Sequence, residues 1–139
     1  MENTDTPLKM ISLLMQYPDN RFFAQLPELE AVLKTMAPGR FKTDVRQFLE
    51  YLRMQPLIRI QESYTAAFDL NPATSLNMTF HRWGDSEKRA AALTRLQQTY
   101  LDAGYEKTTG ELPDYLPLLL EFMAVCPAAR TNEQIRECL

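Results

Sequence analysis

Apolar side chains recur at helical spacing along every long segment of this sequence. The clearest stripe occupies positions i, i+3, i+4 and i+7 and consists of Val45, Phe48, Leu49 and Leu52. This period fits an α-helix with one buried face and excludes a half-buried strand, in which apolar and polar residues alternate. We find no convincing alternation elsewhere. The pattern therefore predicts an all-α fold, with residues 1–139 forming a single-domain helical bundle.

Capping residues and prolines divide the first half of the sequence. Thr6 is predicted to cap the first helix, with Pro7 in its first turn, where the missing N–H costs nothing. A short element is expected around residues 22–23, and Pro27 is expected to start a separate helix. The sequence thus predicts helices broken at prolines, followed by the stripe at 45–52.

The second half contains a long helix between two predicted loops. Residues 69–79 are rich in Asn, Ser, Thr and Pro, which predicts a loop, and residues 105–112 form a second one. The helix between them is expected to run from about Ser86 to Ala103. Ser86 supplies its cap, and Gly104 can adopt the left-handed conformation that often follows a helix.

The C-terminal segment is predicted to hold a central helix and the start of another. Residues 113–125 are apolar nearly all round, which is typical of a helix in the middle of a bundle. A capping box follows, with Thr131 at the cap and Gln134 at the third helical position. Few residues remain before Leu139, so we expect that the chain is truncated and lacks one or more C-terminal helices.

Composition excludes several classes of protein. The 139 residues suit one domain, and the formal net charge of −3 argues against general affinity for nucleic-acid backbones. No apolar run is long enough to cross a membrane, and residues 1–6 lack the features of a signal peptide, so a cytoplasmic location is expected. A mildly acidic surface suits a basic partner.

The sequence offers no set of catalytic or metal-binding residues. His81 is the only histidine, and no nucleophile, phosphate-binding or zinc-protease motif accompanies it. Cys126 and Cys138 are too far apart for a CxxC motif and are predicted to be core or near-core thiols. We therefore expect that the protein is not an enzyme and binds no metal or cofactor stably.

Several residues have both a structural and a binding interpretation. His81 either pins a loop to the bundle or faces a ligand, and Trp83 either covers the core or lines a peptide groove. Tyr64 and Phe68, one helical turn apart, are either core residues or the aromatic floor of a cleft. The sequence leaves both interpretations open.

Three acidic residues form a further candidate group. Asp114 and Glu121 lie on one stripe of the apolar helix, and Glu111 approaches from the preceding loop. In one interpretation, Asp114 caps its helix and Glu121 is solvated. In the other, the group forms an acidic lip beside an apolar groove, suited to a peptide with paired arginines. Arg89 or Arg95, from the long helix, can instead neutralise these carboxylates.

Several short stretches, taken in this order and spacing, resemble the nitrate reductase molybdenum cofactor assembly chaperones (the delta subunit, or NarJ, family). They are Ser63-Tyr64-Thr65-Ala66-Ala67-Phe68-Asp69, His81-Arg82-Trp83-Gly84-Asp85-Ser86, Arg89-Ala90-Ala91-Ala92-Leu93, Tyr100-Leu101-Asp102-Ala103-Gly104 and Glu111-Leu112-Pro113-Asp114-Tyr115-Leu116-Pro117, with Tyr17-Pro18-Asp19 ahead of them. No single stretch is specific enough alone. The match covers most of residues 8–125.

The resemblance implies a function. This family belongs to the redox-enzyme maturation proteins, alongside chaperones of dimethyl sulfoxide and trimethylamine N-oxide reductases. Its members are all-helical cytosolic proteins that bind the N-terminal segment of a molybdoenzyme catalytic subunit. The nitrate reductase member keeps that subunit open while molybdopterin guanine dinucleotide is inserted, delays membrane docking, and is absent from the finished enzyme. Cofactor-biosynthesis proteins are possible further partners.

The resemblance also implies a partner-peptide site. Its members are Tyr64, Phe68, Asp69, His81, Trp83, Glu111, Asp114, Tyr115 and Glu121. Relatives of the other reductases carry His where this chain has Tyr115, which removes a proton-titrating group from that position. We expect an amphipathic peptide helix to lie in a groove around Tyr64, Phe68 and the helix at 113–122.

Two alternatives compete with the chaperone interpretation. The first is a permanent helical adaptor or scaffold subunit of a redox complex, which would remain in the purified enzyme. The second is a nucleotide hydrolase that couples partner release to turnover. The sequence does not specify the oligomeric state, the isoenzyme served or the number of partner sites.

Overall fold

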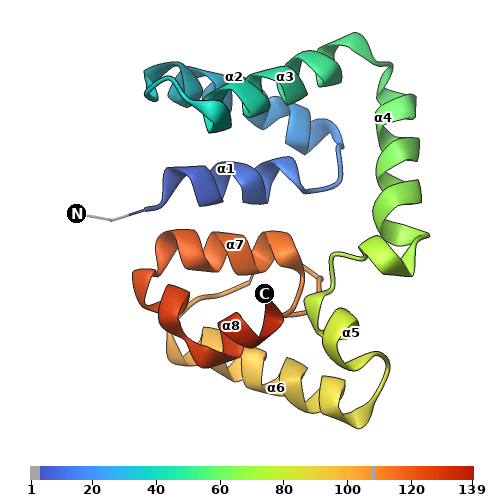
Figure 1. Ribbon diagram of the computed structural model, residues 1–139, viewed down its shortest axis with the longest axis vertical. Helices are drawn as coiled ribbons and strands as arrows, with labels where there is room; N and C mark the ends of the chain where they lie inside the picture. Colours follow the sequence, from blue (N-terminus) through green and yellow to red (C-terminus); the bar gives the residue numbers. More distant parts are fainter. Residues whose placement is uncertain (1–3, 108) are drawn as a thin grey trace. The chain divides into compact units, whose positions relative to one another are not determined.

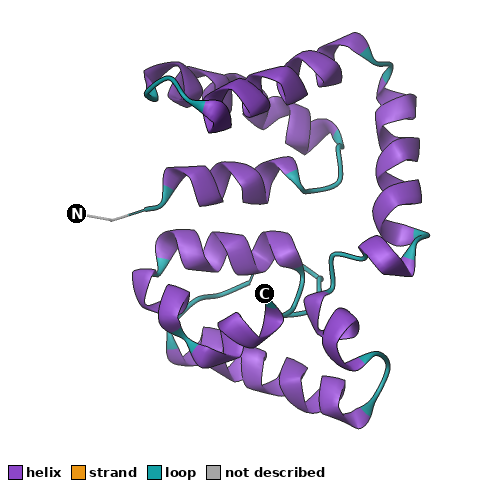
Figure 2. Ribbon diagram, viewed as in Figure 1, coloured by secondary structure: helices purple, strands orange, loops and turns teal. Residues whose placement is uncertain are grey.

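The computed structural model describes residues 4–107 and 109–139. In agreement with the predicted all-α fold, the elements named in this part are helical (Figures 1 and 2). They are α1 (Thr6–Leu14), α2 (Asn20–Thr35), α3 (Arg40–Met54), α4 (Leu57–Tyr64), the π-helical turn η1 (Thr65–Asp69), the 3-10 turn η2 (Pro72–Thr74), α5 (Met78–Trp83), α6 (Glu87–Asp102), α7 (Leu116–Val125), the 3-10 turn η3 (Pro127–Thr131) and α8 (Glu133–Cys138). Among these residues, strand-like pairing is limited to one isolated bridge, Asn77 with Tyr115.

The chain folds as two compact units, which are described separately. The first unit combines the N-terminal segment up to Met15 with residues 71–139 and so contains α1 and α5 to α8. The second unit, Gln16–Leu70, contains α2 to α4 and η1. The prediction of one domain over the whole chain stays a prediction.

The core of the first unit is built around α7, which was predicted to be central. Leu119 and Ala124 have no exposed surface, and Phe122 is buried beside them. The buried Ser12 hydroxyl of α1 donates to the Pro117 carbonyl at 2.5 Å, and the Asp5 N–H donates to the Ala124 carbonyl at 2.9 Å. These bonds hold α1 along α7. The other side of α7 packs on a cluster from three further segments: Leu96, Tyr100, Ala129, Ile135 and Cys138.

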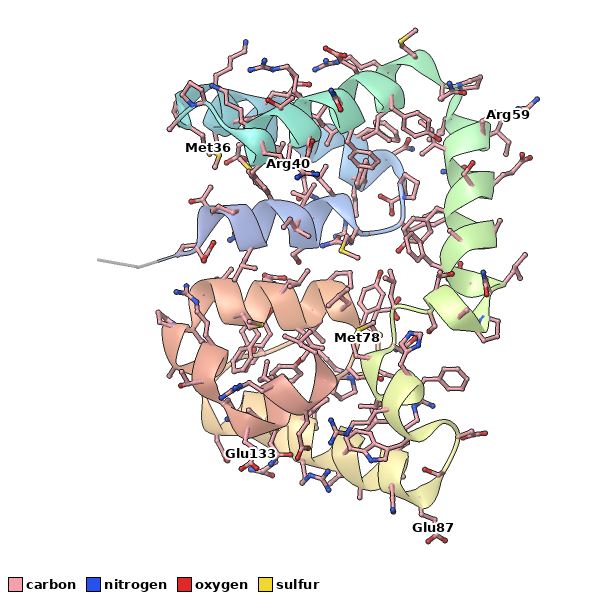
Figure 3. The ribbon with its side chains drawn as sticks, in the orientation of Figure 1. Met36, Arg40, Arg59, Met78, Glu87 and Glu133 are labelled. Atoms are coloured by element: carbon pink, nitrogen blue, oxygen red, sulfur yellow. The ribbon has the colours of Figure 1, made fainter. Side chains whose placement is uncertain are left out.

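In the second unit, α2 and α3 bury their apolar stripes and run side by side (Figure 1). The stripe predicted at 45–52 is confirmed for Val45, Leu49 and Leu52, whereas Phe48 at its margin is 38% exposed. An ion pair between Arg53 of α3 and Glu30 of α2 links the two helices. Charged side chains such as Arg59 of α4 point to solvent (Figure 3).

Two predicted helix starts are wrong by one residue. Asp5, rather than Thr6, caps α1, because its Oδ1 accepts the Leu8 N–H at 3.1 Å. Asn132, rather than Thr131, caps α8, and its Oδ1 accepts two backbone N–H groups. In both places adjacent residues have capping side chains, so composition alone does not choose between them.

Two other predictions of broken structure are also wrong. Asp19 caps α2, which then continues through Pro27, so the short element at 22–23 and the following helix are one helix. Pro27 is exposed and removes only one hydrogen bond from a long helix. Residues 69–79 are not all loop: η2 lies within them, and α5 begins at Met78. The caps predicted for α6 are confirmed, with Ser86 at its start and Gly104 (φ 71°) after its end.

Candidate functional site

A buried carboxylate, Asp114, lies just ahead of α7 in the first unit. Its Oδ2 accepts hydrogen bonds from the Thr79 N–H at 2.9 Å and the Thr79 hydroxyl at 2.5 Å. Its Oδ1 accepts a hydrogen bond from the Asn77 side-chain amide at 3.0 Å. Arg89 of α6 lies 3.9 Å from Oδ2 and donates through Nε to the Thr79 hydroxyl at 3.1 Å. Asp114 thus caps α5 from a distant part of the chain and joins α5, α6 and the start of α7.

This arrangement corrects the expected location of Asp114. We expected it either at an exposed acidic lip or as the cap of its own helix, but its exposed fraction is 0%. Tyr115 occupies the cap position of α7, and no side chain there bonds the helix N-terminus. Of the two arginines left open by the sequence, Arg89 pairs with Asp114 at 3.9 Å, whereas Arg95 pairs with Glu137.

The other two acidic residues lie in different environments. Glu121 is half-buried on α7 and accepts a hydrogen bond from the Tyr105 hydroxyl. Burial, followed by the neighbouring Glu121 carboxylate, raises the pKa of Tyr105. Glu111 is exposed in the loop, where its carbonyl accepts a bond from the Lys107 ammonium. The three acidic residues of the predicted group therefore lie in three separate environments. Glu111 is the one that is exposed.

An aromatic cluster lies beneath α7. The rings of Tyr100, Tyr105 and Phe122 are 4.8–5.6 Å apart, and the Tyr100 hydroxyl donates to the Pro113 carbonyl at 2.6 Å. Burial raises the pKa of Tyr100 and raises that of the nearby Cys138 thiol to about 11. Cys138 is buried, as predicted for a core thiol, whereas Cys126 is half-buried.

His81 and Trp83 both lie on α5. His81 is exposed, and its Nε2 is 2.7 Å from the Ser75 carbonyl, so the imidazole ties α5 to the preceding loop. Trp83 is half-buried, with the Arg82 guanidinium 5.2 Å from its ring centre. Tyr115 is half-buried and packs against the core of the first unit.

The second unit holds the remaining three predicted site residues. Tyr64 ends α4, and its ring meets Phe68 edge to face at 4.8 Å and Tyr17 at 5.5 Å. Both Tyr64 and Phe68 are half-buried, and Asp69 is exposed at the end of η1. Gln61 adds a bond to the Pro18 carbonyl at 3.0 Å. The π-helical form of η1 is a rare turn that is frequent at functional sites.

The nine predicted site residues therefore fall in two units. Tyr64, Phe68 and Asp69 form one surface in the second unit, which we call the aromatic surface. The other six belong to the first unit, where Asp114 has no exposed atoms while His81 and Glu111 remain open to solvent. The residues of each unit are considered separately below.

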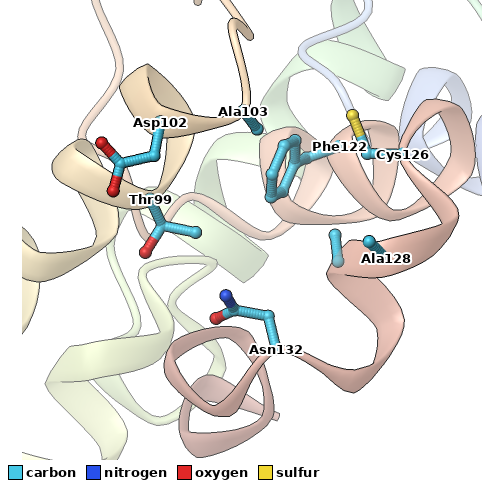
Figure 4. A pocket seen from close by; sticks show the side chains of 8 residues that line it. Thr99, Asp102, Ala103, Phe122, Cys126, Ala128 and Asn132 are labelled. Atoms are coloured by element: carbon cyan, nitrogen blue, oxygen red, sulfur yellow. The ribbon is translucent and has the colours of Figure 1, made fainter.

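Sequence reasoning missed a hollow of about 270 Å³ in the first unit, which we call the α6–α8 hollow (Figure 4). Its lining residues come from α6, α7 and η3 and from the positions that cap them: Thr99, Asp102, Ala103, Phe122, Cys126, Ala128, Ala129 and Asn132. Thr99 and Asp102 lie on one side, and Cys126 and Ala128 on the other. Because these residues come from helices that are far apart in the sequence, no spacing along the chain predicts the hollow.

Within residues 4–107 and 109–139, no three His, Cys, Asp or Glu side chains gather as a metal ion would require. None of the described helices combines the length and apolar character needed to span a membrane.

Comparison with known proteins identifies relatives. The family model described as the nitrate reductase delta subunit matches residues 37–139. A Bacillus subtilis protein described as the nitrate reductase molybdenum cofactor assembly chaperone NarJ is 32% identical over 126 residues, which cover 89% of this chain and 68% of that protein. The Escherichia coli NarJ chaperone is 31% identical over 132 residues, covering 94% of this chain and 56% of the relative.

The fold also has a counterpart among solved structures. An Archaeoglobus fulgidus protein described as a redox enzyme maturation protein superposes with a TM-score of 0.65, over 96% of this chain and 80% of that chain. At 19% identity, this likeness concerns the fold alone.

Proposed function

This chain belongs to the nitrate reductase delta subunit family, and from that membership we propose that it is a chaperone dedicated to nitrate reductase assembly. It binds the N-terminal segment of the catalytic subunit in the cytoplasm and supports insertion of the molybdenum cofactor before the enzyme reaches the membrane. The observation that carries this proposal is the family match over residues 37–139, joined by relatives described as molybdenum cofactor assembly chaperones.

The aromatic surface supports a role in binding a peptide. Tyr64 and Phe68 are large side chains that keep part of their area exposed while their neighbours hold them in place. Rings that are fixed before binding lose little conformational freedom when an apolar peptide face covers them. Asp69 lies beside them and favours basic residues on that peptide.

The first unit offers a second set of contacts. Glu111 and His81 are exposed, and Trp83 and Tyr115 are half-buried, so all four present area to a ligand. Asp114 and Glu121 act differently, because their carboxylates bond Thr79 and Tyr105 within the chain. We assign these two carboxylates a positioning role: they fix α5 and the loop before α7, from which the exposed groups project.

Cofactor chemistry enters only through the partner. The proposed contribution of this chain is to hold the catalytic subunit in a form that accepts molybdopterin guanine dinucleotide, with no stable cofactor site of its own. Burial of apolar peptide surface supplies most of the affinity, and the acidic groups add selectivity for a basic segment.

Isothermal titration with a peptide from the N-terminus of the nitrate reductase catalytic subunit tests this proposal. We expect saturable binding of the native peptide and none of a scrambled peptide with the same charge. Phe68→Ala is expected to weaken binding by about tenfold, because a buried aromatic anchor is lost. Phe48→Ala is the matched control, since Phe48 is partly exposed in the same unit on a different helix.

Two outcomes would count against the proposal. Equal binding of native and scrambled peptides would mean that the chain recognises charge alone. Equal weakening by Phe68→Ala and Phe48→Ala, with thermal unfolding unchanged in both variants, would remove the aromatic surface from the site.

A further inference from the structure

The short connection that precedes α2 carries an exposed aromatic side chain, Tyr17. Pro18 has a fixed φ angle and restricts the residue before it to an extended conformation, so the backbone of Tyr17 is limited before any tertiary contact forms. The Asp19 N–H donates to the Tyr17 carbonyl at 2.9 Å, and the Asp19 carboxylate caps α2. The Tyr17 side chain is therefore carried on a backbone of defined shape at the start of the second unit.

This connection is tied to α4, which lies beside it (Figure 1). The Gln61 side chain donates to the Pro18 carbonyl at 3.0 Å, across 43 positions of the chain. Pro18 itself is buried. Because this bond joins two segments that are distant in the sequence, it fixes the connection, and Tyr17 with it, against α4.

Three aromatic rings contact one another in series at the end of α4. The Tyr17 ring meets the Tyr64 ring edge to face, with their centres 5.5 Å apart and their planes at 87°. The Tyr64 ring in turn meets Phe68, at 4.8 Å and 62°. Such contacts are favourable because the positive edge of one ring faces the negative face of the next. Tyr64 is therefore held between two rings, and its orientation depends on Tyr17 as well as on Phe68.

Tyr17 is held through its ring rather than through its hydroxyl. Its exposed fraction is 42%, whereas Tyr64 and Phe68 are half-buried. In the part of the chain that the structure describes, the Tyr17 hydroxyl bonds no other group. The contact that Tyr17 makes with Tyr64 is thus one that a phenylalanine side chain would also make.

We propose that Tyr17 is a positioning residue of the aromatic surface: its ring holds the Tyr64 ring in the orientation that receives the partner peptide. The inference rests on the proposed function, in which the aromatic surface binds the N-terminal segment of the catalytic subunit. A ring that is held in place before binding loses little conformational freedom in the complex. Tyr17 lies outside the nine site residues predicted from the sequence.

A double-mutant cycle, measured by isothermal titration with the native peptide, tests this role. Tyr64→Ala is expected to weaken binding by about tenfold. Tyr17→Ala is expected to weaken it by about fivefold, which is the size of one edge-to-face contact. Because Tyr17 acts through Tyr64, the double variant is expected to bind about as tightly as Tyr64→Ala, whereas independent contacts would give a loss of about fiftyfold.

Two further variants separate positioning from a general loss of structure. Tyr17→Phe keeps the ring and is expected to restore the affinity of the unmodified chain. Tyr51→Ala is the matched control, because Tyr51 is also 42% exposed in the same unit but stacks on Phe48 of α3. Its affinity for the peptide is expected to be unchanged.

Gln61→Ala tests the tie to α4 while all three rings are kept, and it decides the question even if Tyr17→Ala misfolds. Loss of the bond to the Pro18 carbonyl is expected to weaken peptide binding by about threefold, since the connection that carries Tyr17 is released. Gln25→Ala is its control, because the Gln25 side chain bonds the Arg21 carbonyl of its own helix.

The outcomes separate this inference from the proposed function. Additive losses in the cycle, or a Tyr17→Phe variant that binds as weakly as Tyr17→Ala, would overturn the positioning role while peptide binding by the unmodified chain leaves the proposed function standing. Full affinity of both Tyr17→Ala and Gln61→Ala would overturn it too. Failure of the unmodified chain to bind the native peptide would overturn the proposed function and, with it, this inference.

Discussion

Asp114 connects three helices through one side chain. The Asp114 carboxylate accepts hydrogen bonds from Thr79 and Asn77 and has no exposed area. Arg89 donates to the Thr79 hydroxyl. Removing one member of a buried ionic network leaves the others desolvated and unpaired, which is more costly than losing a surface ion pair. Asp114 is therefore expected to contribute more to stability than an exposed carboxylate does.

Asp114→Ala is expected to lower the free energy of unfolding by about 3 kcal/mol, because the Thr79 N–H loses its acceptor and the Arg89 guanidinium loses its ion-pair partner. Glu111→Ala, at an exposed position in the same loop, is expected to change it by less than about 0.5 kcal/mol. Urea denaturation followed by circular dichroism measures both. Equal stability of the two variants would contradict the internal role of Asp114.

At the residue scale, sequence patterns identified Asp114 as important but misplaced it. Helical spacing puts Asp114 and Glu121 on one stripe, yet α7 starts only at Leu116, so Asp114 lies before the helix and turns inward. Its partners Asn77 and Thr79 are more than 30 residues away. A pattern read along the chain contains no information about such distant donors.

At the element scale, α2 shows how tertiary packing outweighs a local signal. Pro27 was expected to begin a helix, but Leu26, Leu29 and Leu33 continue one buried stripe across it. The gain from burying that stripe exceeds the cost of one lost backbone hydrogen bond and of the clash of the proline ring. The boundaries of α6 were predicted correctly, with Ser86 before its first turn and Gly104 after its last.

Pro27→Ala is therefore expected to stabilise the chain, because a backbone N–H returns to the middle of α2. The gain is expected to be about 1–2 kcal/mol, the helix-propensity difference less the greater freedom of the unfolded chain. Thermal unfolding compares this variant with Gln25→Ala, an exposed change in the same helix. A midpoint that stays the same or falls for Pro27→Ala would mean that α2 is adapted to a bend at the proline.

At the scale of the whole molecule, family-specific stretches were more informative than periodicity. Periodicity predicted the all-α class, which the structure confirms. The stretches from Tyr64 to Pro117 indicated a family, and the match of residues 37–139 to that family confirms it. The division into two units and the α6–α8 hollow were not predictable, because both depend on which segments meet in space. Apolar stripes identify the face of a helix that is buried but not its partner.

The chaperone account differs from a permanent adaptor in what the finished enzyme contains. A chaperone acts before assembly is complete and then leaves, whereas an adaptor stays. Both have the same helical surfaces, so the distinction depends on the state of the catalytic subunit and on the composition of the purified enzyme.

The most direct test measures the molybdenum content of nitrate reductase purified from cells with and without the gene for this chain. The account predicts that enzyme made without it contains little molybdenum, and that enzyme made with it is loaded and free of this chain. Full molybdenum content in its absence, or this chain present in fixed ratio in the purified enzyme, would contradict the account.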